Sequence, residues 1–265
     1  MANNYLIGVS KNIAYSSAVL LKDGKILSAL SLERITRIKA DKGDPQKIIS
    51  YFHQTYPDSI SAPIITATND NLTLAYAAYY ASAFNNSVIL VIDQTISVYL
   101  GTSHKIEHLV DYDLPLIDLY NHISAYIGLD SSGGEYKMMG LAAYGKPIYY
   151  AQLKHALHSG EFKTALTLPY LPRNKVEKIR TFDKNLSASM EDLFADEISH
   201  LVAQIKLQYG HKNLCLAGIG ALNCRSNYAL LKQQDFKKIF ITPLHNGEAL
   251  ALGCAYKAFG QKTHN

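Results

Sequence analysis

An unbroken apolar run, SVILVID at residues 87–93, constrains the fold more than any other segment of the sequence. Such a run, ending in an acid, is typical of a strand buried on both faces, because a strand with one solvent face alternates apolar and polar residues. Further strand-like runs occur at residues 213–218 and 237–242, with helical patterns between them. Strands that alternate with helices predict an α/β fold with a parallel or mixed sheet packed by helices.

The first 115 residues carry the signals of a β-meander followed by mixed α/β structure. YLIGVS at residues 5–10 is followed by two apolar runs separated by Asp23-Gly24, a strong turn signal between two strands. After Pro45, apolar residues stand at helical intervals. The other elements expected here are a strand at 62–68, a helix at 71–84 and a hairpin at 98–112.

After Pro115 the pattern becomes mainly helical, beginning with residues 116–129. The next stretch, GGEYKMMGLAAYGKP at 133–147, is too rich in glycine for an ordinary helix, so we expect a loop there, and irregular structure at 157–184. A long helix is predicted from Ser187, capped by Ser189, and a closing helix at 248–259. The buried stripe of the long helix is predicted to contain Leu193, Phe194, Ile198, Leu201, Val202 and Ile205. We expect two halves, residues 1–115 and 116–265.

Composition excludes several classes of protein. The chain has 265 residues, of which 48% are hydrophobic, which is enough for a real core. Its formal net charge of +4 is dispersed, so a broad nucleic-acid-binding face is not expected. No apolar run approaches the roughly 18 to 20 residues of a membrane span, and we expect a cytoplasmic location without membrane partners. Cys215, Cys224 and Cys254 lack metal-type spacing, and we expect them to be small buried residues.

Two glycine-bearing turns place backbone amides at the start of a helix. In NLCLAGIGALNCRSN, Gly218 and Gly220 follow a strand and Asn223 stands in or near the first turn of a helix. Unpaired amides and close approach to glycine backbone are features of nucleotide sites. For this motif alone, tight packing of strand against helix is the preferred interpretation. Asn246-Gly247 precedes a helix in the same manner, with a turn plus a cap as the alternative.

Three segments together carry a resemblance to a known family. GGEYKMMGLAAYGKP, LCLAGIGALNCRSNYAL and ITPLHNGEALALGCAYKA resemble, in this order, the signature blocks of the NodU/CmcH family of O-carbamoyltransferases. The segment at residues 6–41 resembles the family's opening hairpin and its E-R-x-x-R-x-K block, and residues 76–93 resemble the helix and strand that follow. The resemblance therefore runs along most of the chain.

This resemblance implies an actin-like ATPase fold with two RNase H-like halves, in which mixed sheets are flanked by helices. It also implies transfer of a carbamoyl group from carbamoyl adenylate, an ATP-derived co-substrate, to a hydroxyl of a small acceptor. Lys137 is then expected to face a phosphate and Glu135 to orient it or a ligand, while Gly133 and Gly134 bring the chain close to that ligand. The nucleotide-binding residues implied by the blocks are Gly133, Gly134, Gly218, Gly220, Asn223, Asn246 and Gly247. Without the resemblance, Glu135 and Lys137 are a partly exposed pair in a loop.

The chain departs from the family at its metal site. Family members carry a block of the type HHxxHA, whose histidines hold a metal with a carboxylate from the C-terminal block. Here Asp70, Asn71 and Leu74 stand at those positions, and Asn246 stands where the carboxylate is expected, with His245 beside it. An amide is a weak ligand for first-row metals and leucine is none. We therefore expect the usual metal to be absent.

Further departures concern the nucleotide and the donor. The family's glycine-rich turn of the type DGxGE is replaced by residues 93–97, DQTIS, which makes close backbone approach harder. The chain ends at Asn265, so the adenylate is expected to come from a separate adenylate-forming protein or a complete family member. Residues considered for other roles, but interpreted as surface or packing residues, are His104, His108, His122, Tyr76, Tyr79 and Tyr80.

Two hypotheses follow. The chain is either a compact carbamoyltransfer domain, an O-carbamoyltransferase if active, or a catalytically degenerate relative that acts as a nucleotide-binding or scaffolding subunit. The metal positions favour the second hypothesis, and the glycine–lysine block favours the first.

Overall fold

The computed structural model describes residues 4–11, 15–103, 105–129, 133–159, 180–244 and 246–262. The chain forms two compact units. The first comprises residues 1–111, 211–222 and 236–265, and the second comprises residues 112–210 and 223–235. Both sheets described below lie in the first unit, and the described helices of the second unit have no sheet between them. The division into two RNase H-like halves at residue 115 stays a prediction.

The first sheet is the predicted β-meander with one added strand. Its strands are β1 (Tyr5–Ser10), β2 (Ser17–Lys22), β3 (Lys25–Ser31) and β4 (Ile64–Thr66), in the order β3-β2-β1-β4. β1 is antiparallel to β2 and parallel to β4. Asp23 and Gly24, with φ of 52° and 77°, form the two-residue turn between β2 and β3, which matches the right-handed twist of the hairpin.

The second sheet contains β5 (Ser87–Ile92), β6 (Ile96–Gly101), β7 (Ile106–Tyr112), β8 (Asn213–Ala217) and β9 (Lys238–Ile241), in the order β7-β6-β5-β8-β9. The central strand is β5, and all six of its residues are buried. It is antiparallel to β6 and parallel to β8, and β8 is parallel to β9.

The two sheets share one strand order. In each, three consecutive strands lie side by side, and the first of them pairs in parallel with a strand that comes later in the chain. The predicted α/β class with two mixed sheets flanked by helices is confirmed. The repeated order agrees with the duplicated, actin-like ATPase fold that the resemblance implies.

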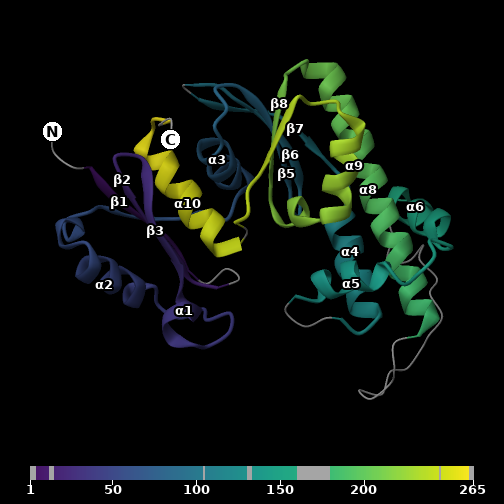
Figure 1. The fold of residues 1–265 in the computed structure, drawn as a ribbon, viewed down its shortest axis with the longest axis horizontal. Coiled ribbons are helices and arrows are strands. Elements are labelled where there is room, and N and C mark those ends of the chain that lie inside the picture. Colours follow the sequence, from purple (N-terminus) through teal and green to yellow (C-terminus); the bar gives the residue numbers. More distant parts are fainter. Residues whose placement is uncertain are drawn as a thin grey trace. The chain divides into compact units, whose positions relative to one another are not determined.

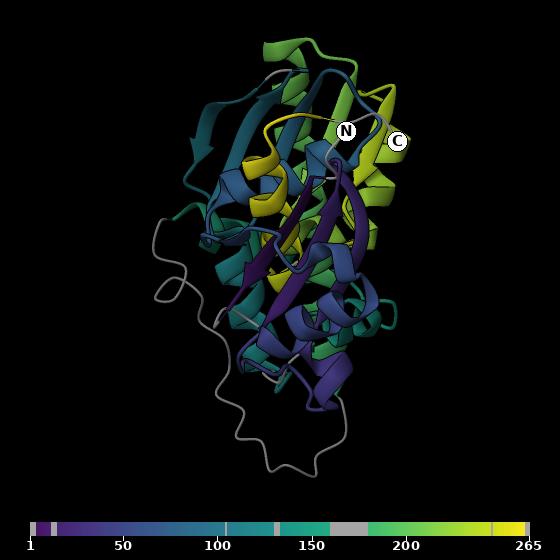
Figure 2. The ribbon, with the colours of Figure 1, turned by 90° about the vertical axis from the view of Figure 1, so that its left-hand side faces the viewer.

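Helices cover both faces of the first sheet because side chains alternate along its strands. Ile7 and Val9 of β1 pack with α1 (Leu32–Thr36) and α2 (Gln46–Thr55), while Leu6 packs on the other face with α3 (Asn71–Ala81) and α10 (Asn246–Phe259). A short 3-10 helix, η1 (Pro57–Ser59), follows α2. In Figure 1, α2 and α10 lie on opposite sides of these strands, and Figure 2 shows α2 on the viewer's side.

The cluster around α3 and α10 continues into the second sheet through residues of β5 and β8. These two helices therefore form a layer between the sheets of the first unit (Figure 1). Tyr79 and Tyr80 of α3 are buried in this layer, so their interpretation as packing residues is confirmed.

The second unit contains α4 (Leu116–Tyr126), α5 (Gly134–Ala142), α6 (Tyr150–His158), α8 (Thr181–Tyr209) and α9 (Cys224–Gln233). The predicted buried stripe of the long helix α8 is confirmed. Its predicted start is wrong, because α8 begins at Thr181. Ser189 does not cap it but lies inside it, where its hydroxyl donates to the Asn185 carbonyl at 2.7 Å. Of the segment predicted to be irregular, residues 160–179 lie outside the described residues.

The prediction of a loop at residues 133–147 is also wrong, because α5 spans most of this stretch. Met138 and Ala142, one helical turn apart, are buried. Packing of this face outweighs the roughly 1 kcal/mol that each internal glycine costs a helix. Glu135 and Lys137 therefore lie on the first turns of a helix.

Cys215 and Cys254 are buried as predicted, but Cys224 is exposed, because it is the first residue of α9. Among the residues that the structure describes, no helix combines the length and the apolar character needed to cross a bilayer.

Candidate functional site

The glycine–lysine block forms the start of α5 in the second unit. Gly133 is the N-cap, with a left-handed φ of 82°. A Cβ on Gly134 would lie 1.6 Å from the Leu129 carbonyl oxygen, so the chain itself requires glycine there. Glu135 is half-buried and favourably placed at the positive end of the helix, and Lys137 is exposed. Their roles toward a ligand stay predictions.

Asn223, predicted as a nucleotide-binding residue, is the N-cap of α9. Its side-chain oxygen accepts from the Ser226 amide at 2.8 Å, and its side-chain nitrogen donates to the Glu191 carboxylate at 2.8 Å. Both polar atoms of the amide thus have partners within the chain, and only 4% of Asn223 is exposed.

Glu191 was not among the predicted site residues, and the helix start predicted at Ser187 to Ser189 puts it in a first turn. The residue lies in the middle of α8 and is 1% exposed. Besides Asn223, Tyr120 of α4 donates its hydroxyl to the Glu191 carboxylate at 2.5 Å. The available signal was periodicity, because Glu191, Phe194 and Ile198 share one helix face and only the first is charged.

Burial dominates the electrostatics of this group. It raises the pKa of Glu191 above its ordinary value, and the hydrogen bonds from Tyr120 and Asn223 offset part of that rise. Burial also raises the pKa of Tyr120, and the neighbouring Glu191 charge adds to the effect.

Gly218 and Gly220 lie in the first unit, at the end of β8. Gly218 has a φ of 84°, and a Cβ there would stand 2.4 Å from the Ile92 carbonyl oxygen at the end of β5. Gly220 is buried in η2 (Ile219–Leu222), the short helix that precedes α9. The end of β5 thus requires glycine at residue 218, a contact between strand ends and not the packing of strand against helix that was expected. The ligand role of the two glycines stays a prediction.

Asn246 and Gly247 form the start of α10, also in the first unit. A Cβ on Gly247 would lie 2.4 Å from the Tyr15 carbonyl oxygen and 2.9 Å from the Ser17 hydroxyl. Ser17 and Ser10 are paired across β1 and β2, and both are fully buried. Within the part of the chain that the structure describes, neither hydroxyl has a hydrogen-bond partner. The start of α10 therefore brings helix amides and two unsatisfied hydroxyls together.

The residues at the family's metal positions do not fit a first-row metal. Asp70 caps α3, accepting from the Thr73 amide at 2.6 Å and from the Thr68 hydroxyl. Asn71 donates its amide to the Thr95 carbonyl at 2.8 Å, and Leu74 is 5% exposed in the core. Burial opposes ionisation of Asp70, but the hydrogen bonds from Thr68 and Thr73 outweigh it and lower its pKa.

A cavity of about 380 Å³ lies at these positions in the first unit. Over the described residues, no three His, Cys, Asp or Glu side chains are grouped so that they could hold a metal ion. His108, on the rim, is exposed and lies 2.9 Å from the Asp111 carboxylate. His104 and His245 lie outside the described residues.

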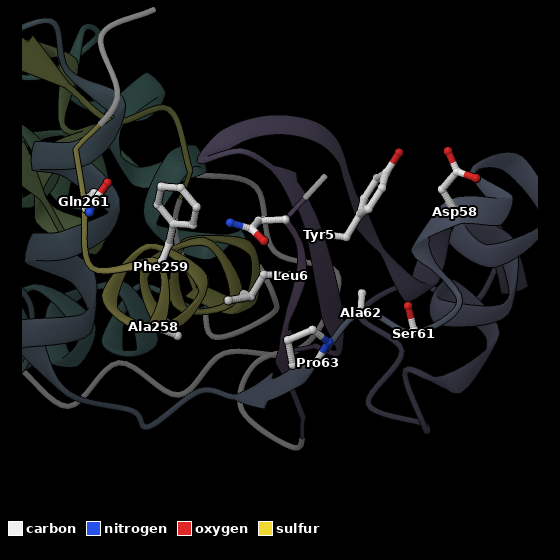
Figure 3. A pocket seen from close by; sticks show the side chains of 10 residues that line it. Tyr5, Leu6, Asp58, Ser61, Ala62, Pro63, Ala258, Phe259 and Gln261 are labelled. Carbon is white, nitrogen blue, oxygen red and sulfur yellow. The ribbon is translucent and has the colours of Figure 1, made fainter. Parts of the chain in front are cut away.

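Two larger cavities contain none of the predicted site residues. One, of about 460 Å³, lies where the start of β1 meets the end of α10, and Figure 3 shows Leu6 and Phe259 on one side of it with Tyr5 and Asp58 on the other. The other, of about 600 Å³, lies in the second unit between α8, α9 and the start of α6.

Comparison with known proteins gives a family match. The family described as Carbamoyltransferase N-terminus matches residues 60–256. The nodulation protein NolO of Bradyrhizobium diazoefficiens is 31% identical over 201 residues, which cover 68% of this chain and 36% of that protein. NolNO of Sinorhizobium fredii is 24% identical over 315 residues, covering 90% of this chain and 45% of that protein.

The uncharacterized protein sll1178 of Synechocystis is 24% identical over 355 residues, covering 98% of this chain and 58% of that protein. The chain thus spans about half the length of the curated relatives it matches. Among solved structures, component A of the (R)-2-hydroxyglutaryl-CoA dehydratase of Acidaminococcus fermentans has a TM-score of 0.47 at 15% identity, covering 97% of this chain and 99% of that one. The match over residues 60–256 places the chain in the carbamoyltransferase family, to which it belongs through the N-terminal region of those proteins.

Proposed function

We propose that this chain transfers a carbamoyl group from carbamoyl adenylate to a hydroxyl of a small-molecule acceptor. The adenylate is supplied by a separate adenylate-forming protein or by a complete family member. The acceptor oxygen attacks the carbamoyl carbon, the bond from that carbon to the phosphate oxygen breaks, AMP leaves, and the hydroxyl proton is lost. Family membership supports this reaction class.

One structural observation carries the nucleotide half of the proposal, namely the start of α10 beside Ser10 and Ser17. A helix start offers unpaired amides and the positive end of a dipole to an anion. A buried hydroxyl without a partner costs free energy that a hydrogen bond from a ligand phosphate offsets. Both hydroxyls are fully buried, so the proposal requires them to become accessible to the phosphate when the nucleotide binds.

In the second unit, the proposed roles in carbamoyl transfer belong to two charged residues, Lys137 and Glu135. The ammonium group of Lys137 is the source of positive charge that this unit offers to the transfer step. Glu135 orients that ammonium group or the acceptor. No step is routed through a metal, because Asp70, Asn71 and Leu74 do not fit one.

The second candidate function is that of a nucleotide-binding or scaffolding subunit without turnover. The residues at the family's metal positions favour this second function. Leu74 is buried and the Asn71 amide donates to the Thr95 carbonyl, where the family's metal histidines are expected. The two functions share nucleotide binding and differ in transfer.

Calorimetry with AMP and a non-hydrolysable carbamoyl adenylate analogue tests the shared step. Ser17→Ala should weaken binding by about tenfold or more, the loss of roughly one charge-assisted hydrogen bond. Ser59→Ala is the matched control, because Ser59 is also fully buried in the first unit and its hydroxyl is also without a partner in the described part of the chain. Equal affinities for both variants and the wild type would remove the assignment of the phosphate to the start of α10.

A further inference from the structure

The buried carboxylate of Glu191 joins three helices of the second unit. Tyr120 approaches it from α4 at 2.5 Å, and Asn223 approaches it from the start of α9 at 2.8 Å. Carboxylates are almost never fully buried unless they are paired or hydrogen-bonded, and both oxygens here accept a hydrogen bond. Two hydrogen bonds thus hold the carboxylate. The one from Asn223 involves the start of α9, and the one from Tyr120 involves the start of α5.

The contact through Asn223 reaches the first turn of α9. The Asn223 amide group is oriented by its donation to Glu191, and this orientation points its oxygen at the Ser226 amide, 2.8 Å away. A rotated amide would lose both bonds. The carboxylate therefore fixes the N-cap of α9.

The contact through Tyr120 reaches the first turn of α5. The Tyr120 hydroxyl oxygen lies 3.1 Å from the Glu135 carbonyl oxygen as well as 2.5 Å from the Glu191 carboxylate. The ring of Tyr120 is held edge-on by Phe194, with 5.7 Å between ring centroids. Glu191 and Phe194 together place the hydroxyl against the start of the glycine–lysine block.

We propose that Glu191 is a positioning residue: its carboxylate, through Asn223 and Tyr120, sets the first turns of α9 and α5 and thereby the affinity for nucleotide. The part that concerns affinity rests on the proposed function, whereas the part that concerns the helix starts does not. No ligand contact is assigned to Glu191 itself.

A second acid on the same helix separates this role from general stabilisation. Glu197 is 9% exposed, and its carboxylate lies 3.0 Å from His158 and 3.8 Å from Lys154, both on α6. Among the described residues, the hydrogen bond and ion pairs of the Glu197 carboxylate go to α6, and none goes to α5 or α9. Glu197→Ala therefore removes a largely buried carboxylate from α8 without touching either helix start.

Glu191→Gln is the conservative variant, and its hydrogen bonds can all be satisfied. The glutamine oxygen accepts from Asn223, and the glutamine amide donates to the Tyr120 oxygen. The Tyr120 proton then goes to the Glu135 carbonyl, which is already 3.1 Å away. Glu191→Ala leaves the Asn223 nitrogen without an acceptor, which costs a buried donor its hydrogen bond.

Hydrogen exchange measured by NMR on the full chain tests the positioning role without any ligand. Glu191→Ala should accelerate exchange about tenfold or more at the amides of Lys137 and Met138 in α5 and of Ser226 and Asn227 in α9. Glu191→Gln should restore the wild-type rates, and Glu197→Ala should leave these four amides unchanged. Unchanged rates in Glu191→Ala, or equal acceleration in Glu197→Ala, would overturn the proposal.

The same variants are then titrated with the non-hydrolysable carbamoyl adenylate analogue. Glu191→Ala should bind about tenfold more weakly than Glu191→Gln and Glu197→Ala. Equal affinities would overturn the functional half of the proposal. If the wild type binds no analogue, the proposed function fails instead, and the exchange rates alone decide the positioning role.

Discussion

A single buried carboxylate makes stability depend on pH in a direction that can be worked out. Burial raises the pKa of Glu191 in the folded chain above its ordinary value of 4.5. Between these two pKa values the folded protein binds more protons than the unfolded chain, so this residue's contribution to the free energy of unfolding falls as pH rises. That contribution is full below pH 4.5 and is lost as pH rises through the folded-state pKa.

Glu191→Gln cannot titrate, so its free energy of unfolding should rise relative to that of the wild type as pH increases above 4.5, and then level off. Urea unfolding of both proteins at several pH values measures this difference. A difference that stays constant across the range would contradict the raised pKa.

At the scale of elements, α5 shows which glycines of GGEYKMMGLAAYGKP its packing requires. A Cβ on Gly134 would overlap the Leu129 carbonyl oxygen at 1.6 Å, whereas a Cβ on Gly140 would meet nothing within 4 Å. Gly134→Ala should therefore destabilise the chain by about 1–3 kcal/mol, as backbone shifts in packed sites do. Gly140→Ala should stabilise it by about 0.5–1 kcal/mol through helix propensity. Urea unfolding checks both, and a Gly134→Ala variant as stable as the wild type would contradict the overlap.

The sequence predicted correctly those elements that a short run of neighbouring residues determines. The run at residues 87–93 became the fully buried β5, and Asp23-Gly24 became the turn of the first hairpin. The helix α5 and the first turns of α8 were missed because tertiary packing, and not propensity, decides them. The close approach of Gly247 to the Tyr15 carbonyl and the hydrogen bond from Tyr120 to Glu191 join residues far apart in the chain, which no local pattern reveals.

At the scale of the whole molecule, the family match assigns the chain to the carbamoyltransferases, and the strand order shared by the two sheets agrees with the fold expected of that family. The candidate residues fall into two groups, one in each unit. Gly218, Gly220, Asn246 and Gly247 belong to the first unit, and the start of α5 and Asn223 belong to the second. The residues at the family's metal positions do not fit a first-row metal, and nucleotide binding by the glycine blocks stays a proposal.

Transfer of labelled carbamoyl groups tests the central claim most directly. The chain is incubated with ATP, ¹⁴C-labelled carbamoyl phosphate, a separate adenylate-forming protein and a panel of hydroxylated small molecules, and label on the acceptors is counted. The account predicts labelled acceptor and AMP in amounts that depend on this chain, with a loss of about a hundredfold or more in Lys137→Ala, as removal of a charge-stabilising group gives. Binding of the adenylate analogue without any labelled acceptor would contradict the claim and leave a nucleotide-binding subunit.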